Sequence, residues 1–429
     1  MTGFRTPALP EERIRERARL GTAAAFPDLA AYGSTAFGQD TADGTGRDAL
    51  DALRIAPPVF MPLRLEKLID LGREPLHSDV ELTTRIGGFT SPLPVYLSAF
   101  GSTRAAGTDH VLALSRQAGR LGIPMGVGEN IMPIAGYGRS GEDSGRTVLD
   151  RIRAYTEELP DGLGGLVVQQ STEDADAEVW NLVYSDPGAQ PLLDSGRLAF
   201  ELKTGQGAKP GLGGLTVLDR AEARRVDEQY AIEPVYGTEA ERVLRCSSPG
   251  TFTEEILRQQ IHLMRNNYPR AKVWVKLHPG RDIGHAAAVA WAAGADAVTV
   301  DGAEGGSGWA PRAFLAQVGL PLGECLSRIG AHGGSLLASG RIWEGSRAAK
   351  CLALGATAVG LGRGALVAVD ENPDSGLVNL VDCLALELRM LISALGKYTP
   401  RALGPEDLWA PQPLLPALAE DPREAVAHE

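Results

Sequence analysis

Short runs of continuously apolar residues alternate with longer segments of helical apolar spacing along most of the chain. Eight of these runs predict β-strands: PVYLSAF (94–100), IPMGVG (123–128), LVVQ (166–169), LAFELK (198–203), KVWVKL (272–277), AVTV (297–300), SLLAS (335–339) and AVGLG (358–362). Apolar residues at helical spacing predict helices between several of them, at 107–121, 254–267, 282–293, 311–318 and 345–354. Strands that are apolar on both faces and separated by helices are typical of a parallel sheet.

The number of strands favours one way of completing that sheet. Eight βα units make up one (β/α)8 TIM barrel, so we predict an α/β fold of this type. A doubly wound open sheet is the alternative, but the pattern contains no visible topological switch point. We expect an N-terminal extension over residues 1–90, the barrel over 91–400 and a C-terminal tail over 401–429.

Three segments lie outside the regular alternation. The charged sequence EERIRERARL (11–20) predicts a helix in the extension, and the apolar spacing of 376–396 predicts a long helix that covers the barrel. The segment 204–250 is too long for a simple barrel loop, which indicates a functional insertion. The roles of residues 1–90 and 216–250 stay open at this point.

Composition and charge exclude several classes of protein. The 42 Lys and Arg against 54 Asp and Glu give a net charge of −12, which argues against a general nucleic-acid or anionic-membrane binder. The four cysteines lie far apart, so we expect no metal, no iron–sulfur centre and no disulfide framework. No apolar segment has the length of a signal peptide or a membrane span, and we expect a cytoplasmic protein.

The most specific string is KTGQGAKPGLGG (203–214), which directly follows a predicted strand. In a barrel the carboxyl ends of the strands carry the catalytic face. The string presents Lys203, Gln206 and Lys209 on a backbone with little side-chain bulk, which suits a carboxylate, a phosphate or a developing negative charge. A solvated loop with ordinary surface lysines is the alternative.

Three further glycine-rich turns also follow predicted strands. In VDGAEGGSG (300–308), Asp301 and Glu304 flank a turn whose successive N–H groups can bind an anion, although a tight βα turn would also need these glycines. SGRIWEG (339–345) and GLGRGAL (360–366) follow the last two strands, where barrels commonly bind phosphate. Gly340, Gly362 and Arg363 are the candidates there.

Two ionisable residues at strand ends stand out. Lys276 lies within the apolar strand VWVKL, where a lysine faces either an anionic ligand or a structural partner acid, and Arg281 follows closely as a candidate carboxylate ligand. Glu129 follows the second strand and is a candidate acid or base. His278, His285 and His332 are isolated, which is more typical of surface or capping residues.

Taken together, these strings resemble the flavin domain of glutamate synthase. ELKTGQGAKPGLGG is similar to the QGAKPG signature of that family, and WVKL, DGAEGGSG, ASGR and VGLGRGAL follow in the family's order. FGS (100–102) and GVGE (126–129) are similar to its first two strand ends. The layout, with LGKYTPRALGPEDLWA near the end, most resembles the large subunit of N-methylglutamate synthase-type enzymes.

The resemblance implies an FMN-binding barrel and a role for each matching residue. FMN would contact Ser98, Ala99, Gly101, Gln169, Lys276, Gly305, Gly306, Gly340, Gly362 and Arg363. Lys209, Glu129 and Gln206 would be catalytic, and the substrate would contact Lys203, Arg281 and Glu304. The reaction implied is hydride transfer from reduced FMN to the C=N carbon of a 2-imino acid, within amino-acid metabolism.

The sequence also departs from the family pattern in three ways. Leu215 stands where glutamate synthase has a glutamine after the two glycines, so the contacts to a 2-oxo acid differ. GALVAVDENPD lacks the family's three-cysteine cluster, and the chain starts with Met1 and Thr2 rather than a glutaminase cysteine. We therefore expect no internal iron–sulfur relay and no ammonia production within this sequence.

Four functions stay under consideration. The first is an FMN-dependent oxidoreductase that forms or breaks a C–N bond of an amino acid or 2-oxo acid. The second is other FMN-barrel chemistry, such as isomerisation or hydroxy-acid oxidation, although VDGAEGGSG lacks the histidine base that the latter uses. The third is a flavin-binding subunit that depends on an electron-donor or amine-supplying protein, and the fourth a lyase barrel without flavin. Homo-oligomerisation stays open; nucleic acid and membrane are not expected partners.

Overall fold

The computed structural model describes residues 9–25, 48–99, 108–128, 146–171 and 179–410, apart from short gaps at 206, 208, 229, 236–237, 240, 249 and 306–310. Eight parallel strands in this part of the chain form a closed barrel. They are β4 (Val95–Leu97), β5 (Met125–Val127), β6 (Leu166–Ser171), β7 (Leu198–Lys203), β11 (Lys272–Leu277), β12 (Ala297–Asp301), β13 (Leu336–Ser339) and β14 (Ala358–Leu361). The eight predicted strands and the predicted barrel are confirmed.

Closure of the sheet settles the choice between the two predicted topologies. β14 pairs with β4 in parallel, with Val359 opposite Val95 and Leu361 opposite Leu97. An open doubly wound sheet would leave these two strands unpaired at opposite edges, so that alternative is excluded.

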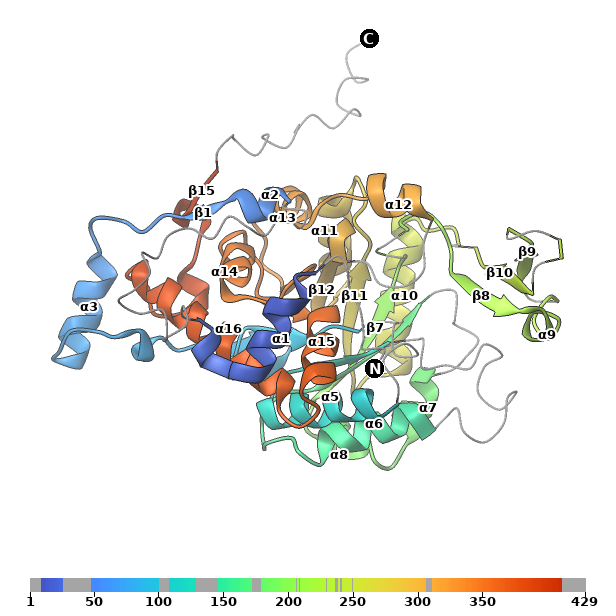
Figure 1. The fold of residues 1–429 in the computed structure, drawn as a ribbon, viewed down its shortest axis with the longest axis horizontal. Coiled ribbons are helices and arrows are strands. Elements are labelled where there is room, and N and C mark those ends of the chain that lie inside the picture. Colours follow the sequence, from blue (N-terminus) through green and yellow to red (C-terminus); the bar gives the residue numbers. More distant parts are fainter. Residues whose placement is uncertain are drawn as a thin grey trace, which may run out of the picture.

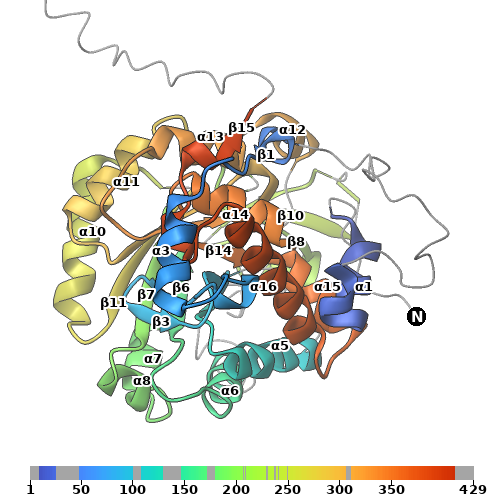
Figure 2. The same cartoon turned by 90° about the vertical axis from the view of Figure 1, so that its left-hand side faces the viewer.

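Helices surround the barrel on its outside, as Figures 1 and 2 show. They are α5 (Thr108–Leu121), α6 (Arg146–Thr156), α7 (Val179–Ser185), α8 (Gln190–Asp194), α10 (Glu254–Asn267), α11 (Ile283–Ala292), α12 (Arg312–Gln317), α13 (Leu322–Ile329), α14 (Gly345–Ala353), α15 (Arg363–Glu371) and α16 (Gly376–Ala394). The long predicted covering helix is α16, and it packs on α14 and α15. None of the helices in the described residues is long and apolar enough to cross a membrane.

The inside of the barrel changes from apolar to polar along its axis. At the amino end, Trp274, Val167 and Leu337 belong to one buried apolar cluster. The hairpin of β2 (Thr84–Ile86) and β3 (Phe89–Ser91) closes this end, where the Trp274 indole donates a hydrogen bond to the Gly87 carbonyl at 3.0 Å. Toward the carboxyl end the buried residues are polar, namely Gln169, Glu201, Lys276, Thr299, Asp301 and Ser339. The polar end is therefore where a ligand would be bound.

The N-terminal segments pack onto the barrel. The predicted helix at 11–20 is α1 (Glu11–Leu20), which places Ile14 and Ala18 in a cluster with Trp343, Val367 and Leu380. α2 (Ala49–Ala52) follows, and β1 (Arg54–Ile55) pairs with β15 (Leu408–Trp409) near the other end of the sequence. α3 (Pro62–Leu71) contributes no buried residue.

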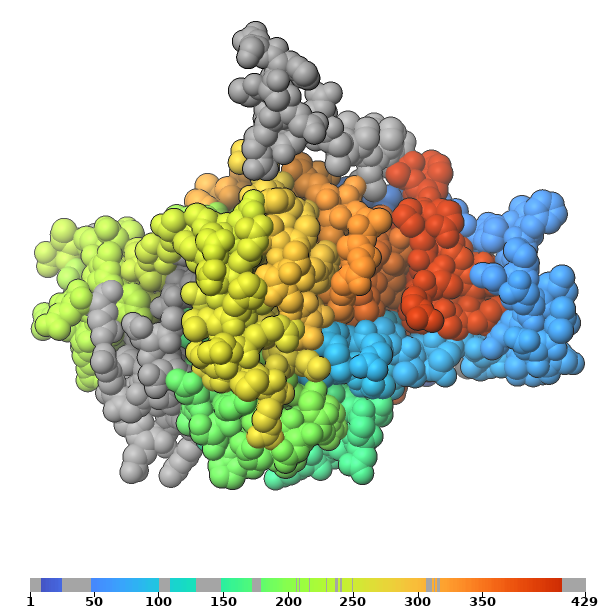
Figure 3. All heavy atoms as spheres, turned by 180° about the vertical axis from the view of Figure 1, so that it is seen from behind, coloured from blue at the N-terminus to red at the C-terminus, as the bar shows by residue number. Residues whose placement is uncertain are grey.

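The insertion after β7 forms a small antiparallel sheet of its own. Its strands are β8 (Leu215–Asp219), β9 (Ala231–Glu233) and β10 (Arg242–Cys246), in the order β8-β10-β9, with α9 (Arg220–Ala223) after β8. Leu218, Ala223, Val226 and Val243 are its core. Figures 1 and 3 show this sheet at one end of the molecule and α3 at the opposite end.

We predict that Gly87→Ala destabilises the protein more than Gly72→Ala. Both glycines have a positive φ, of 54° and 64°, so alanine at either costs about 1–2 kcal/mol of backbone strain. A Cβ at Gly87 would also lie 2.5 Å from the Trp274 ring, whereas a Cβ at Gly72 meets nothing within 4 Å. Overpacking should therefore add about 1–3 kcal/mol for Gly87→Ala. Urea unfolding of the two variants measures the difference, and equal losses would contradict it.

Candidate active site

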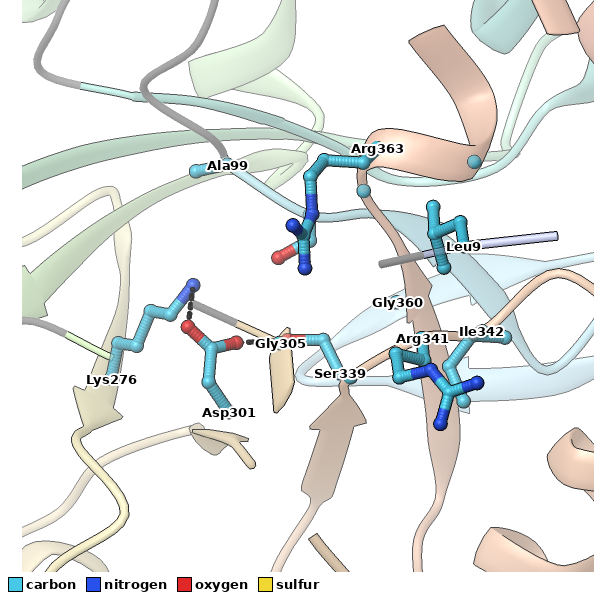
Figure 4. Close-up of a pocket in the computed structure, with 14 residues that line it drawn as sticks. Leu9, Ala99, Lys276, Asp301, Gly305, Ser339, Arg341, Ile342, Gly360 and Arg363 are labelled. Atoms are coloured by element: carbon cyan, nitrogen blue, oxygen red, sulfur yellow. Dashed lines mark hydrogen bonds and ion pairs between the residues drawn. The ribbon is translucent and has the colours of Figure 1, made fainter. Parts of the chain in front are cut away.

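A pocket opens at the carboxyl end of the barrel, between strand ends that are far apart in the sequence (Figure 4). Residues from the ends of β4, β11, β12, β13 and β14 line it together with Leu9 from the N-terminal segment. The lining residues are Leu9, Ser98, Ala99, Lys276, Asp301, Gly305, Ser339, Gly340, Arg341, Ile342, Gly360, Gly362, Arg363 and Gly364. Seven of the residues that the sequence predicted for cofactor binding are thus brought together: Ser98, Ala99, Lys276, Gly305, Gly340, Gly362 and Arg363.

An ion pair forms one wall of the pocket. Lys276 Nζ lies 3.0 Å from Asp301 Oδ2, and their side chains are 8% and 11% exposed. The Ser339 hydroxyl donates a hydrogen bond to the other carboxylate oxygen of Asp301. Lys276 therefore has the structural partner acid that the sequence offered as one interpretation, and its contact with an anionic ligand stays a prediction.

Two guanidinium groups lie on the other side of the pocket, and Figure 4 shows both. Arg363 Nη2 donates to the Glu304 carbonyl at 2.9 Å, and the Arg341 side chain is 10% exposed. Burial lowers the pKa of Arg363, and the positive charge of Arg341 lowers it further. Arg341 also pairs with Asp51 at 3.2 Å and with Asp48 at 3.9 Å, so these acids balance its charge and Arg363 is the guanidinium better placed to attract an anion. Sequence reasoning missed Arg341, although its position after Gly340 in SGRIW was a signal.

Glycines allow the turns of the pocket to come together. A Cβ on Gly305 would lie 2.8 Å from the Gly340 Cα, so the turns after β12 and β13 pack backbone to backbone. Gly362 caps the N-terminus of α15, and Gly362, Arg363 and Gly364 all line the pocket. The first N–H groups of a helix have no partner within the helix and attract negative charge. The backbone N–H groups of this turn are therefore further hydrogen-bond donors for an anion, besides the two guanidinium groups.

Behind the pocket lies a second group of charges, which we name the Arg347 cluster: Arg347, Arg341, Asp48, Asp51 and Glu304. Arg347 is 1% exposed and donates to Asp48 Oδ2 at 2.8 Å, Asp51 Oδ1 at 2.6 Å and Glu304 Oε1 at 2.9 Å. Its Nε donates to the Gly340 carbonyl at 2.9 Å. The cluster therefore fastens the N-terminal segment to two turns of the pocket.

The Arg347 cluster accounts for the side chain of Glu304, which the sequence analysis assigned to the substrate. The carboxylate accepts from Arg347 and from the Leu322 N–H at 3.1 Å. Burial and the neighbouring Asp48 raise the pKa of Glu304 to about 7. Burial opposes ionisation of Asp48 as well, but the hydrogen bonds and charge of Arg347 outweigh it and lower the pKa of Asp48 to about 2. Glu304 thus has partners of its own outside the pocket.

A second set of buried polar side chains lies inside the barrel, below the pocket lining. Glu201 is 4% exposed and accepts hydrogen bonds from the Thr299 hydroxyl at 2.5 Å and from the Gln169 amide. Burial raises the pKa of Glu201, and the charge of Lys276 opposes this effect. Gln169, predicted to lie near the cofactor, is therefore held below the pocket by its bond to Glu201.

The described residues around the QGAKPG segment follow β7, and none of them is among the lining residues of the pocket. Lys203 is half-buried at the end of β7, and Lys209 is 5% exposed and close enough to Cys246 to affect the pKa of its thiol. Arg281 is exposed. His278 directly follows β11, and a Cβ on Gly205 would lie 2.6 Å from its Nδ1. This histidine, interpreted from the sequence as an isolated residue, therefore packs against Gly205, directly before the QGAKPG segment.

The remaining predicted site residues, namely Glu129, Gln206, Gly101 and Gly306, lie outside the described residues. Within the described part of the chain, no group of three or more His, Cys, Asp or Glu side chains is arranged to hold a metal ion.

Comparison with known proteins identifies the central part of the chain. Residues 161–372 match the conserved region in glutamate synthase. The archaeal-type NADPH glutamate synthase of Dehalococcoides mccartyi is 32% identical over 186 residues, which cover 41% of this chain and 36% of that protein. A glutamate synthase large subunit-like protein of Rhizobium meliloti is 33% identical over 183 residues, covering 41% and 40%. The resemblance predicted from the motifs is confirmed over this region, and the match spans two fifths or less of these relatives' length.

Solved structures agree on the fold. A soluble mutant of the membrane-associated (S)-mandelate dehydrogenase from Pseudomonas putida superposes with a TM-score of 0.57 and 19% identity. The superposition covers 93% of this chain and 99% of that one. At this identity the similarity supports the barrel architecture alone.

We predict that Glu304 makes the stability of the protein fall as the pH rises toward 8. Its pKa is raised from 4.5 to about 7, so the folded state holds the proton more tightly than the unfolded state. The resulting stability is full below pH 4.5 and is lost as the pH rises through 7. Between pH 5 and pH 8, wild type should lose on the order of 2 kcal/mol relative to Glu304→Gln. Urea unfolding at four pH values measures this, with exposed Glu66→Gln as control. Parallel curves for wild type and Glu304→Gln would contradict it.

Proposed function

We propose that this chain, whose residues 161–372 carry the conserved region of glutamate synthase, is an FMN-dependent oxidoreductase acting on a C–N bond of an amino acid or 2-oxo acid. The observation that carries the proposal is the pocket in which Lys276, Arg341 and Arg363 meet three glycine turns at the carboxyl end of a barrel. An anionic ligand suits these groups.

The residues present fit FMN in two places. Its phosphate would take the N-terminus of α15 together with the guanidinium groups of Arg363 and Arg341. Its ring would lie against Ser98 and Ala99, with the ammonium of Lys276 near N1 and the C2 carbonyl.

FMN would supply hydride transfer, and the protein would supply binding and charge. Lys276 would stabilise negative charge on the ring. Lys203 and Lys209, at the end of β7 and in the following loop, would hold the substrate carboxylates, and Gln206 and Glu129 would complete the substrate side. The reduced amino product needs a proton on nitrogen, for which Glu129 and Lys209 are the candidates in the proposal.

Electrons and amine would come from outside this sequence. Its four cysteines lie far apart in the sequence and form no disulfide in the structure. We therefore include an electron-donor or amine-supplying protein as a partner in the proposal. Leu215, at the start of β8, stands at a position where the insertion can shape the choice of substrate.

We predict that the purified protein binds FMN and that Arg363→Leu weakens its preference for FMN over riboflavin. Loss of one charge-assisted phosphate contact costs about 1.5–3 kcal/mol, so the dissociation constant of FMN should rise by roughly 10- to 100-fold. Riboflavin binding should change little. Fluorescence titration with both flavins measures this, with exposed Arg401→Leu as control. A protein that binds neither flavin would refute the proposed function.

We predict that Lys209→Ala leaves FMN bound but slows substrate-dependent reoxidation of the reduced flavin. Removing a donor for the substrate carboxylate should cost on the order of 100-fold in rate. The assay is anaerobic stopped-flow absorbance with 2-oxo acids and an amine, after reduction by dithionite. Lys67→Ala on α3 is the control. If Lys209→Ala instead released the flavin, this lysine would belong to the cofactor site.

A further inference from the structure

We infer that Asp301 sets how strongly this site prefers reduced over oxidised FMN, by offsetting the charge of Lys276. The inference rests on the proposed FMN function and assigns Asp301 a role of its own within that site. Asp301 acts on the cofactor through its charge and through Lys276, and we describe it as a positioning residue.

The geometry holds the Asp301 carboxylate in one place. One oxygen lies 3.0 Å from Lys276 Nζ, and the other accepts from the Ser339 hydroxyl. All three residues line the pocket, and Figure 4 shows them in a row across its wall. Because both carboxylate oxygens are occupied, the side chain cannot turn away from Lys276 without losing two contacts.

The charge of Asp301 reaches both sides of the pocket. It pairs directly with Lys276, and it also acts to raise the pKa of Arg363 across the pocket. In a poorly hydrated wall such a carboxylate cancels much of the field of a neighbouring ammonium. The wall beside Lys276 therefore presents the field of an ion pair, which is weaker than that of a free lysine.

Glu201 gives a natural comparison, because it is a second carboxyl group near Lys276 but lies one layer deeper. Its oxygens accept from Thr299 and Gln169, and it does not line the pocket. Burial raises its pKa, which favours the neutral form. Of these two groups, Asp301 is thus the carboxylate whose negative charge would lie beside the ligand.

The preference for reduced FMN follows from this balance of charge. Reduction by dithionite adds two electrons to the ring and one proton at N5, and leaves a negative charge at N1 and the C2 carbonyl. Lys276 favours that charge, and Asp301 opposes it. Removing the charge of Asp301 should therefore tighten binding of reduced FMN relative to oxidised FMN.

The experiment measures the dissociation constants of oxidised and dithionite-reduced FMN for each variant, under anaerobic conditions. Asp301→Asn should raise the ratio of the oxidised to the reduced constant about tenfold, which corresponds to about 30 mV in the two-electron midpoint potential. Lys276→Met should lower the ratio. Glu201→Gln, which removes a carboxyl group one layer deeper, should change it by less than about threefold. An unchanged or lower ratio in Asp301→Asn would overturn the inference.

Two further measurements separate the charge of Asp301 from its hydrogen bond with Ser339 and test whether its effect depends on Lys276. Ser339→Ala removes the hydroxyl donor and leaves every charge in place, so its ratio should stay near that of wild type. If it shifted as much as Asp301→Asn, the hydrogen bond rather than the charge would be responsible. In a Lys276→Met background, Asp301→Asn should raise the ratio by clearly less than in wild type, and an undiminished rise there would overturn the role through Lys276. A wild type that binds no FMN would instead refute the proposed function.

Discussion

The parallel pairing of β14 with β4 is the constraint on which the rest of the structure depends. It closes the sheet and brings strand ends to one rim, although residues 98 and 339 are far apart in the sequence. The residues inside the barrel then change in polarity along its axis, with Trp274 and its apolar neighbours at the closed amino end. The polar residues are left at the open end, because charged groups need water, partner charges or a ligand.

Compensation of buried charge explains the arrangement around the rim. In a chain with a net charge of −12, the pocket gathers Lys276, Arg341 and Arg363 against a single lining carboxylate, Asp301. Because Lys276 pairs with Asp301, and Arg341 with Asp51 and Asp48, Arg363 carries most of the positive charge that suits an anionic ligand. The surplus of acids is placed behind the pocket, where Asp48, Asp51 and Glu304 surround Arg347. The same acids that hold the turns in place through Arg347 also balance the charge of Arg341.

The N-terminal segments belong to this arrangement. Leu9 lines the pocket, and Asp48 and Asp51 supply partners to Arg347. α1 is fastened by Ile14 and Ala18 in an apolar cluster and by Arg17, which pairs with Glu387 on α16. A segment that the sequence presents as an extension thus contributes to the wall and to the support of the site.

The sequence by itself determined the eight strands, the barrel and the turns that line the pocket, because apolar periodicity and glycine placement are local properties of the chain. It also placed Lys276, Gly340 and Arg363 at the site, since each follows or ends a strand that the pattern reveals. Only the tertiary structure decided which charge faces which. Arg347 and Asp48 are 299 residues apart, and the direction of Glu304 depends on Arg347 and Leu322, which come from other elements. Such pairings depend on how separate elements pack side by side, and no spacing within one segment records that.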